Sequence, residues 1–174
     1  MSTWMVVEDE PDIYDVLLAM FELWGIEGIA FVDGAEAIAW IEAVDEERVH
    51  GDLPELAILD IRLPEASGPE VGNRLRKSAK LNNTAIVLIT AYRLSAEDER
   101  AVIEQAGADY LMYKPLPAMP ELRAILDDVV SKRRKLKENT ETSKSESANK
   151  TKPTSSLSSS ESIKESEKKP PAKP

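Results

Sequence analysis

Five chemically useful side chains stand where short apolar runs of the sequence end. Such uninterrupted runs are typical of strands buried on both faces of a parallel sheet. Because the carboxyl ends of parallel strands meet at one edge, where open α/β folds place their ligands, these side chains are expected to lie together. They are Glu8 and Asp9 after residues 4–7, Asp60 at the end of residues 56–60, Thr90 after residues 85–89, and Lys114 after residues 110–113.

The residue types indicate phosphoryl transfer to a carboxylate. Three converging carboxylates repel one another unless a cation lies among them, and Mg²⁺, which prefers oxygen ligands, suits such a site. Lys114 can neutralise a substrate anion, and the hydroxyl of Thr90 can donate a hydrogen bond to it. Together these groups could form an acyl phosphate on Asp60. Considered one at a time, these residues have ordinary explanations: Asp60 could simply end a strand, and the others could be surface residues. Their joint placement favours a site.

The elements that must position these residues alternate regularly along the chain. Five strands alternating with five amphipathic helices predict a parallel five-stranded sheet with helices on both faces, a three-layer α/β sandwich. The strands are expected at 4–7, 29–32, 56–60, 85–89 and 110–113. Three helices are expected at 12–24, 69–80 and 117–130. A further helix is expected to begin after a cap at Asp33, and another after a cap at Ser95, where Asp98 would complete a capping box.

Composition divides the 174 residues into two regions. Residues 1–130, the predicted domain, carry a net charge of −16, which argues against nucleic-acid binding. Residues 131–174 carry +6 and are rich in Ser, Lys, Glu and Pro, so we expect a disordered tail whose basic start can extend the last helix. The chain lacks cysteine, a membrane-length apolar run and a signal sequence, which favours a cytoplasmic protein.

Four motifs resemble the receiver domain of two-component response regulators. They are Val6-Val7-Glu8-Asp9-Glu10-Pro11, Leu59-Asp60-Ile61-Arg62-Leu63-Pro64 with Gly68 following, Ile89-Thr90-Ala91, and Gly107-Ala108-Asp109 followed by Lys114-Pro115. They lie in the family's order and at its usual intervals across the whole predicted domain. The resemblance implies the flavodoxin-like (βα)₅ fold and a CheY-like stand-alone receiver.

The resemblance also implies roles for individual residues. Asp60 would be the phosphoacceptor, Thr90 the switch hydroxyl and Lys114 the contact to the phosphoryl group, with a cis bond before Pro115. Magnesium would be held by Glu8, Asp9, Asp60 and the backbone carbonyl of Arg62.

Two departures from the family pattern stand out. The family usually has an aromatic residue or histidine three positions before the lysine, where this chain has Leu111. We expect the flanking Tyr110 and Tyr113 to point to the opposite face of the strand from Leu111. Glu8 replaces the commoner aspartate and should still approach the metal. His50, the single histidine, is expected to be an exposed loop residue, so a phosphohistidine donor would be another protein.

Arg62 and Tyr92 each lie two residues after a predicted site residue, Asp60 and Thr90 respectively. We hypothesise that their side chains screen the path of water to an aspartyl phosphate and slow its hydrolysis.

The function that follows is a phosphorylation switch rather than an enzyme, assisting only its own phosphorylation and dephosphorylation. The donor would be a histidine kinase or histidine phosphotransfer protein, and the output protein–protein contact as a monomer or a phosphorylation-dependent dimer. A phosphorylation-independent scaffold is one alternative. A Mg²⁺-dependent aspartyl phosphohydrolase of the haloacid dehalogenase type is another, but it needs an acid two residues after its nucleophile, where this chain has Arg62.

Overall fold

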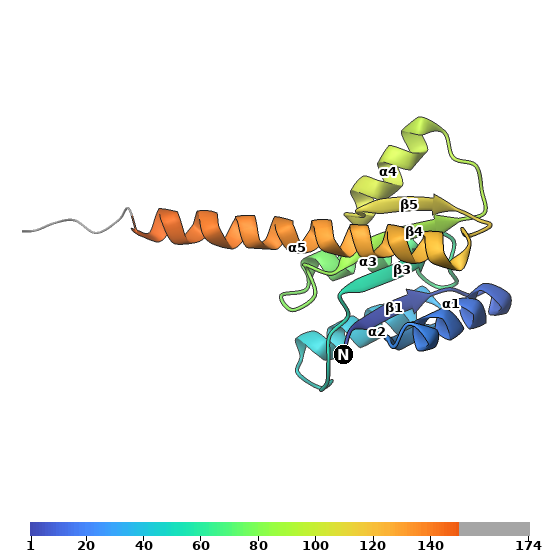
Figure 1. Cartoon of the computed structure of the whole chain (residues 1–174), viewed down its shortest axis with the longest axis horizontal. Coiled ribbons are helices and arrows are strands. Elements are labelled where there is room, and N and C mark those ends of the chain that lie inside the picture. The colour runs from blue at the N-terminus through green and yellow to red at the C-terminus, as the bar shows by residue number, and fades with distance from the viewer. Residues whose placement is uncertain (150–174) are drawn as a thin grey trace, which may run out of the picture.

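The computed structural model describes the backbone of residues 1–149 and the side chains of residues 1–145. Ten elements alternate along it, and the five strands form one parallel sheet in the order β2-β1-β3-β4-β5. The predicted α/β fold with a five-stranded parallel sheet is therefore confirmed (Figure 1). The elements are β1 Thr3–Val7, α1 Pro11–Leu23, β2 Glu27–Phe31, α2 Gly34–Asp45, β3 Leu56–Asp60, α3 Gly68–Lys77, β4 Ala85–Thr90, α4 Ala96–Ala106, β5 Tyr110–Tyr113 and α5 Met119–Asn149.

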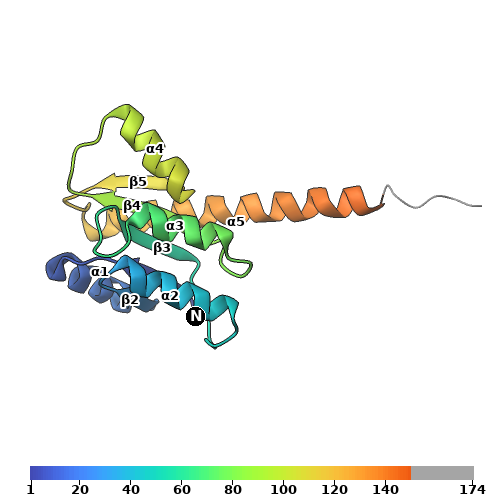
Figure 2. The same ribbon diagram turned by 180° about the vertical axis from the view of Figure 1, so that it is seen from behind.

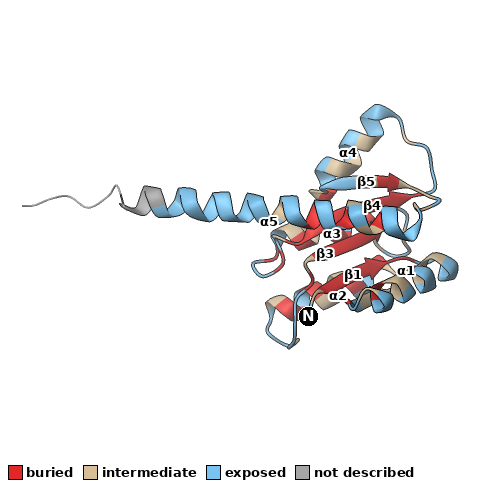
Figure 3. Ribbon diagram, viewed as in Figure 1, coloured by how far each residue is buried: buried red, intermediate tan, exposed pale blue. Residues whose placement is uncertain are grey.

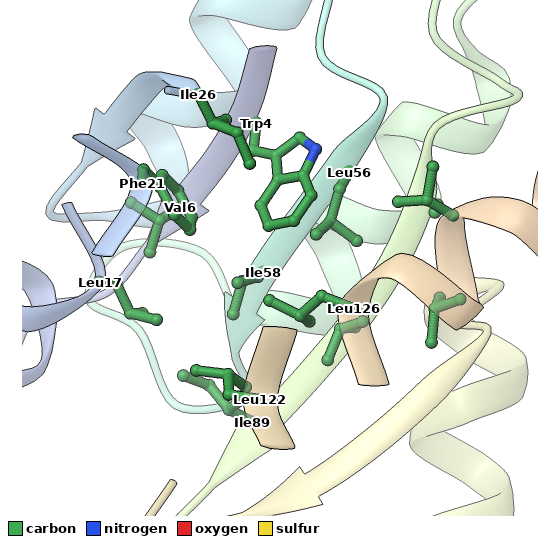
Figure 4. Close-up of a cluster of buried hydrophobic side chains, with 14 of the residues drawn as sticks. Trp4, Val6, Leu17, Phe21, Ile26, Leu56, Ile58, Ile89, Leu122 and Leu126 are labelled. Atoms are coloured by element: carbon green, nitrogen blue, oxygen red, sulfur yellow. The ribbon is translucent and has the colours of Figure 1, made fainter. Parts of the chain in front are cut away.

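The central strands are buried along their whole length, as their uninterrupted apolar runs predict (Figure 3). Alternate residues of each strand feed two separate cores. One core packs α1 and α5 against residues such as Val6, Ile58 and Ile89, which Figure 4 shows converging with Leu122 of α5. The other packs α2, α3 and α4 against residues such as Leu59. The sheet is thus covered by helices on both faces (Figures 1 and 2).

Side-chain caps fix where three of the helices begin. Asp33 accepts a hydrogen bond from the backbone N–H of Glu36 at 2.8 Å, which confirms the predicted cap of α2. Ser95 caps α4 as predicted, through the N–H of Asp98, whereas the reciprocal capping box forms on α3, at Ser67. These bonds satisfy amide groups that have no partner inside the helix. The strand-to-helix junctions next to the candidate site therefore have defined geometry.

The last helix is much longer than predicted. We expected a disordered tail from residue 131 whose basic start, residues 132–135, can extend the last helix. The helix does include this basic start, but α5 continues to Asn149, so the expected disorder is wrong for residues 136–149. Contacts hold the start of the extension: Arg133 reaches Asp109 at 3.3 Å, and Arg134 reaches Glu55 at 2.5 Å. Lys132 pairs with Asp128 one turn earlier at 2.7 Å, a spacing that supports a helix. The rest of the predicted tail, 150–174, lies outside the residues that the structure describes.

Within residues 1–149 no helix combines the length and the apolar character that crossing a membrane requires.

Candidate phosphorylation site

The candidate site lies at the carboxyl edge of the sheet, where the central strands deliver their last residues. Asp60 ends β3 and is 5% exposed, while Thr90 ends the neighbouring β4 and is 1% exposed. Lys114 follows β5, and its backbone N–H donates to the carbonyl of Thr90 at 2.8 Å. The sequence-based prediction that these residues share one edge is therefore matched by the structure.

Two donors fix the carboxylate of Asp60. The backbone N–H of Arg62 donates to Oδ1 at 2.8 Å, and Nζ of Lys114 donates to Oδ2 at 2.5 Å. Each oxygen therefore has one defined partner, and the side chain is held in one orientation. Charge-assisted bonds of this kind are stronger than neutral ones.

Lys114 is the centre of the site's electrostatics. Its ammonium lies 3.0 Å from Oε2 of Glu8 and 3.1 Å from Oε1 of Glu10, in addition to its bond to Asp60. Burial disfavours the charged ammonium, but the hydrogen bonds to Asp60 and Glu8 outweigh it and raise the pKa of Lys114 above its usual value. Lys114 is thus a permanent cation beside the predicted phosphoacceptor.

Glu8 is a buried carboxylate whose two oxygens have different partners. Its Oε1 accepts from the backbone N–H of Glu10 at 3.0 Å, whereas the buried Oε2 is ion-paired with the ammonium of Lys114 at 3.0 Å. Burial raises the pKa of Glu8 to about 7, against the lowering effect of the Glu10 N–H, and the nearby charge of Asp60 raises it further. A buried carboxylate with spare acceptor capacity is suited to binding a cation.

These carboxylates fit a divalent metal ion. One oxygen each from Glu8, Asp9 and Asp60 can be chosen so that all lie within 4.8 Å of one another, with Asp9 exposed and the other two buried. Hard oxygen ligands with one open, solvated side suit Mg²⁺, which keeps several waters when bound. The predicted ligand role of the Arg62 carbonyl stays a prediction, since the structure shows only the Arg62 N–H bound to Asp60.

Gly68 at the start of α3 lets the backbone close tightly behind Asp60. A Cβ atom built on Gly68 would lie 2.1 Å from the carbonyl oxygen of Asp60, closer than atoms can approach. The Gly68 N–H also donates to the carbonyl of Ile61 at 3.1 Å. The glycine of the Asp60 motif is therefore required by close backbone approach.

Arg62 and Tyr92, predicted separately to flank the site, contact each other. The guanidinium carbon of Arg62 lies 3.6 Å from the centroid of the Tyr92 ring, a close cation–π stack. Their backbones bind the reactive side chains, because the N–H of Tyr92 donates to Oγ1 of Thr90 at 3.1 Å and the N–H of Arg62 donates to Asp60. The stack thus joins the β3–α3 and β4–α4 loops.

One prediction about β5 is wrong. Tyr113 does not oppose Leu111: it points to the same face, where its hydroxyl donates to Glu99 of α4 at 2.6 Å. The reason is strand periodicity, since residues two apart share a face. Tyr110 does lie on the face opposite Leu111, as expected, because it shares the α5 side of the strand with Met112.

Three further points complete the comparison with the sequence. The Lys114–Pro115 bond is cis, as the family resemblance implied, and His50 is exposed, as expected. Glu10, which contacts Lys114, was missed; its position directly after Glu8 and Asp9 was the only signal in the sequence.

Comparison with known proteins agrees with this geometry. A model of the response regulator receiver domain family matches residues 4–127. The chain belongs to this family. The polar-differentiation response regulator DivK of Brucella anthropi is 32% identical over 112 residues, which make up 64% of this chain and 83% of DivK.

Solved receiver structures are similar over most of the chain. A CheY-like receiver from Methanospirillum hungatei JF-1 is 26% identical with a TM-score of 0.62, covering 78% of this chain and 98% of that one. The receiver domain of the sensor histidine kinase PA1611 from Pseudomonas aeruginosa PAO1 is 25% identical with a TM-score of 0.62, covering 75% and 98%. That structure has a magnesium ion coordinated in its active-site cleft.

Proposed function

We propose that this receiver accepts a phosphoryl group on Asp60 in a Mg²⁺-dependent reaction, from a histidine kinase or a histidine phosphotransfer protein. The observation that carries the proposal is the Asp60–Lys114 pair beside the acidic cluster of Glu8 and Asp9. Membership of the receiver family, and the magnesium in the PA1611 receiver, support the same assignment.

Each residue has a distinct part in this proposal. Asp60 supplies the nucleophilic carboxylate, and Lys114 neutralises negative charge on the incoming phosphoryl group. Oγ1 of Thr90 accepts from the N–H of Tyr92, so its own O–H is left to donate to a phosphoryl oxygen. A Mg²⁺ ion held by Glu8, Asp9, Asp60 and the Arg62 carbonyl would stabilise charge on the transferring group.

The expected output is protein–protein contact or relay of the phosphoryl group, without turnover of a separate substrate. Arg62 disfavours the phosphohydrolase alternative, because its guanidinium is stacked on Tyr92 and cannot act as a general acid or base at neutral pH. The scaffold alternative does not explain why charged groups are buried together at this site. The test below distinguishes the phosphohydrolase and the scaffold from the proposed receiver.

The test uses acetyl phosphate and Mg²⁺ with the full chain, followed by intact mass spectrometry. We expect one phosphoryl group per chain, removable by hydroxylamine as an acyl phosphate is, and none in Asp60→Asn. Asp12→Asn, an exposed acid at the start of α1, is the matched control and should be phosphorylated normally. Beryllofluoride should bind by calorimetry only when Mg²⁺ is present.

Other results would reject the proposal. Continuous release of inorganic phosphate over many turnovers would indicate a phosphohydrolase. Failure to take up either acetyl phosphate or beryllofluoride in a folded protein would indicate a scaffold. A phosphoryl group that persists in Asp60→Asn would place the acceptor elsewhere.

A further inference from the structure

A groove lies between the extension of α5 and the loop that joins α3 to β4. It consists of two adjoining cavities of about 240 and 320 Å³, which share Asn83, Arg133 and Lys137. Figures 1 and 2 both show α5 passing this loop as the helix leaves the sheet. Glu55 and Thr84, which line the first cavity, directly precede β3 and β4, so the groove is at the amino edge of the sheet, opposite Asp60.

Basic side chains predominate in the lining of the groove. Lys137 and Lys144 supply the charge that is unpaired within the described residues, because Lys80, Arg133 and Arg134 are ion-paired with Glu47, Asp109 and Glu55. Five basic side chains and two acidic ones line it, whereas residues 1–130 carry a net charge of −16. We call this set the basic groove: Lys80, Arg133, Arg134, Lys137 and Lys144, with Glu55 and Glu141. A concave basic surface on an acidic protein attracts an acidic partner selectively.

Several donors in the basic groove have no acceptor within the described part of the chain. Lys137 and Lys144 form no ion pair there, and Nε of Arg133 is buried without a hydrogen bond. The other two nitrogens of Arg133 are engaged, one with Asp109 at 3.3 Å and one with the carbonyl of Asn82 at 3.2 Å. Arg133 is thus held rigidly by the domain itself, and the donors open to a partner are the ammonium groups of Lys137 and Lys144.

The basic groove also contains one exposed apolar side chain and has a definite length. Leu136 is 54% exposed and lines the second cavity, and Asn83 lines both cavities. From Val130 to Lys144 the helix rises roughly 21 Å at about 1.5 Å per residue. An extended peptide rises about 3.3 Å per residue, so about six residues would fill the basic groove.

We propose that the basic groove binds an acidic, extended peptide segment of a partner protein, about six residues long and carrying one large apolar side chain. The carboxylates meet Lys137 and Lys144, and the apolar side chain packs on Leu136. The amide of Asn83 can bond the peptide backbone.

This binding site does not depend on the proposed phosphorylation. The basic groove and Asp60 lie at opposite edges of the sheet, so a partner docked there leaves the phosphoacceptor open. The site would tether the receiver to a partner in both states. Asp60→Asn should therefore bind the acidic peptide as well as the wild type does, and phosphorylation of the wild type should leave its affinity for the peptide unchanged.

The experiment measures the fluorescence anisotropy of a fluorescein-labelled Glu-Glu-Leu-Glu-Glu-Glu peptide titrated with the full chain. Saturable binding that weakens with added salt is expected, and Lys137→Glu should weaken it at least about tenfold. Lys77→Glu is the matched control: it makes the same charge change at an exposed position of α3 outside the basic groove, and should change affinity less than about twofold. Leu136→Ala should weaken binding by a few fold.

Four results would overturn the proposal. Absence of saturable binding at low salt would show that the basic groove does not take such a peptide. Equal losses in Lys137→Glu and Lys77→Glu would show that only overall charge matters. Equal affinity for a single-stranded oligonucleotide would indicate a general polyanion surface. Self-association in sedimentation that Lys137→Glu abolishes would show that a second copy occupies the basic groove. Circular dichroism confirms that each variant is folded.

Discussion

The stack of Arg62 on Tyr92 leads to a quantitative prediction about the lifetime of phosphorylated Asp60. Both side chains project from loops whose backbones bind the reactive groups, through Arg62 N–H to Asp60 and Tyr92 N–H to Thr90. We expect the closed stack to cover the space in front of the carboxylate, because it joins the loops on either side of it. Water then reaches the acyl phosphate mainly when the stack opens, so the stability of the stack sets how often hydrolysis can occur.

The magnitude follows from the geometry. The guanidinium lies 3.6 Å from the ring centroid, and Tyr92 is 51% exposed, so this is a close but solvated cation–π pair. Such pairs contribute about 0.5–1 kcal/mol. Since about 1.4 kcal/mol corresponds to a tenfold change in rate, Arg62→Ala or Tyr92→Ala should shorten the half-life about two- to fivefold. The double variant should be no faster than the faster single variant, because either change removes the whole stack.

The assay loads each protein with acetyl phosphate and Mg²⁺, removes the donor, and follows the remaining acyl phosphate on phosphate-affinity gels. Arg93→Ala is the control, because Arg93 is exposed beside Tyr92 but its guanidinium lies over the Tyr113 ring, at 5.7 Å. Unchanged half-lives in both single variants would refute the reasoning. Effects that multiply in the double variant would show that the two side chains act separately.

Three further predictions concern stability. Gly68→Ala places Cβ 2.1 Å from the carbonyl oxygen of Asp60 and should lower the free energy of unfolding by about 3 kcal/mol. Gly25→Ala should lower it by about 1–2 kcal/mol, because its Cβ meets open space and only the backbone at φ +68° is unfavourable. Urea unfolding measures both. The Ser78 hydroxyl and Arg74 hold the pKa of Asp45 below 3.8, so Asp45 stabilises the fold above pH 3.8 and loses this effect as the pH falls through its folded pKa. Asp45→Asn should therefore lower the thermal midpoint at pH 7, and the difference should vanish in strong acid; a constant difference across pH would contradict this. Arg133→Met should cost about 1–2 kcal/mol because it releases Asp109 and Asn82, whereas Lys135→Met, at an exposed position, should cost under about 0.5 kcal/mol by the same urea titration.

The site was predictable from the sequence because parallel-sheet topology turns strand ends into neighbours. Once the apolar runs ending at Asp60 and Thr90 are assigned as adjacent strands, the positions of their last residues are determined to within a residue. The contacts between side chains were not determined in this way. The bond from Lys114 to Glu10 and the stack of Arg62 on Tyr92 depend on loop conformations that no periodicity specifies.

The helical extension of α5 was missed for a different physical reason. Residues 131–149 have almost no apolar side chains to bury, and a composition of this kind ordinarily leaves a segment disordered. What the composition does not show is that Arg133 and Arg134 reach acceptors far away in the sequence, at Asp109 and Glu55. Helix propagation from a nucleus already formed by residues 119–130 also costs much less than starting a new helix.

The error at Tyr113 changes how the site connects to the rest of the molecule. With Leu111 at the family's aromatic position and Tyr113 assigned to the other face, β5 would present no aromatic side chain to α4. The structure places Tyr113 on that face, one residue before Lys114, with its hydroxyl on Glu99. Glu99 raises the pKa of the Tyr113 hydroxyl above its usual value, so the tyrosine remains a neutral donor at physiological pH. The strand therefore keeps an aromatic contact with α4, two residues nearer to the carboxyl end of β5 than the family pattern places it.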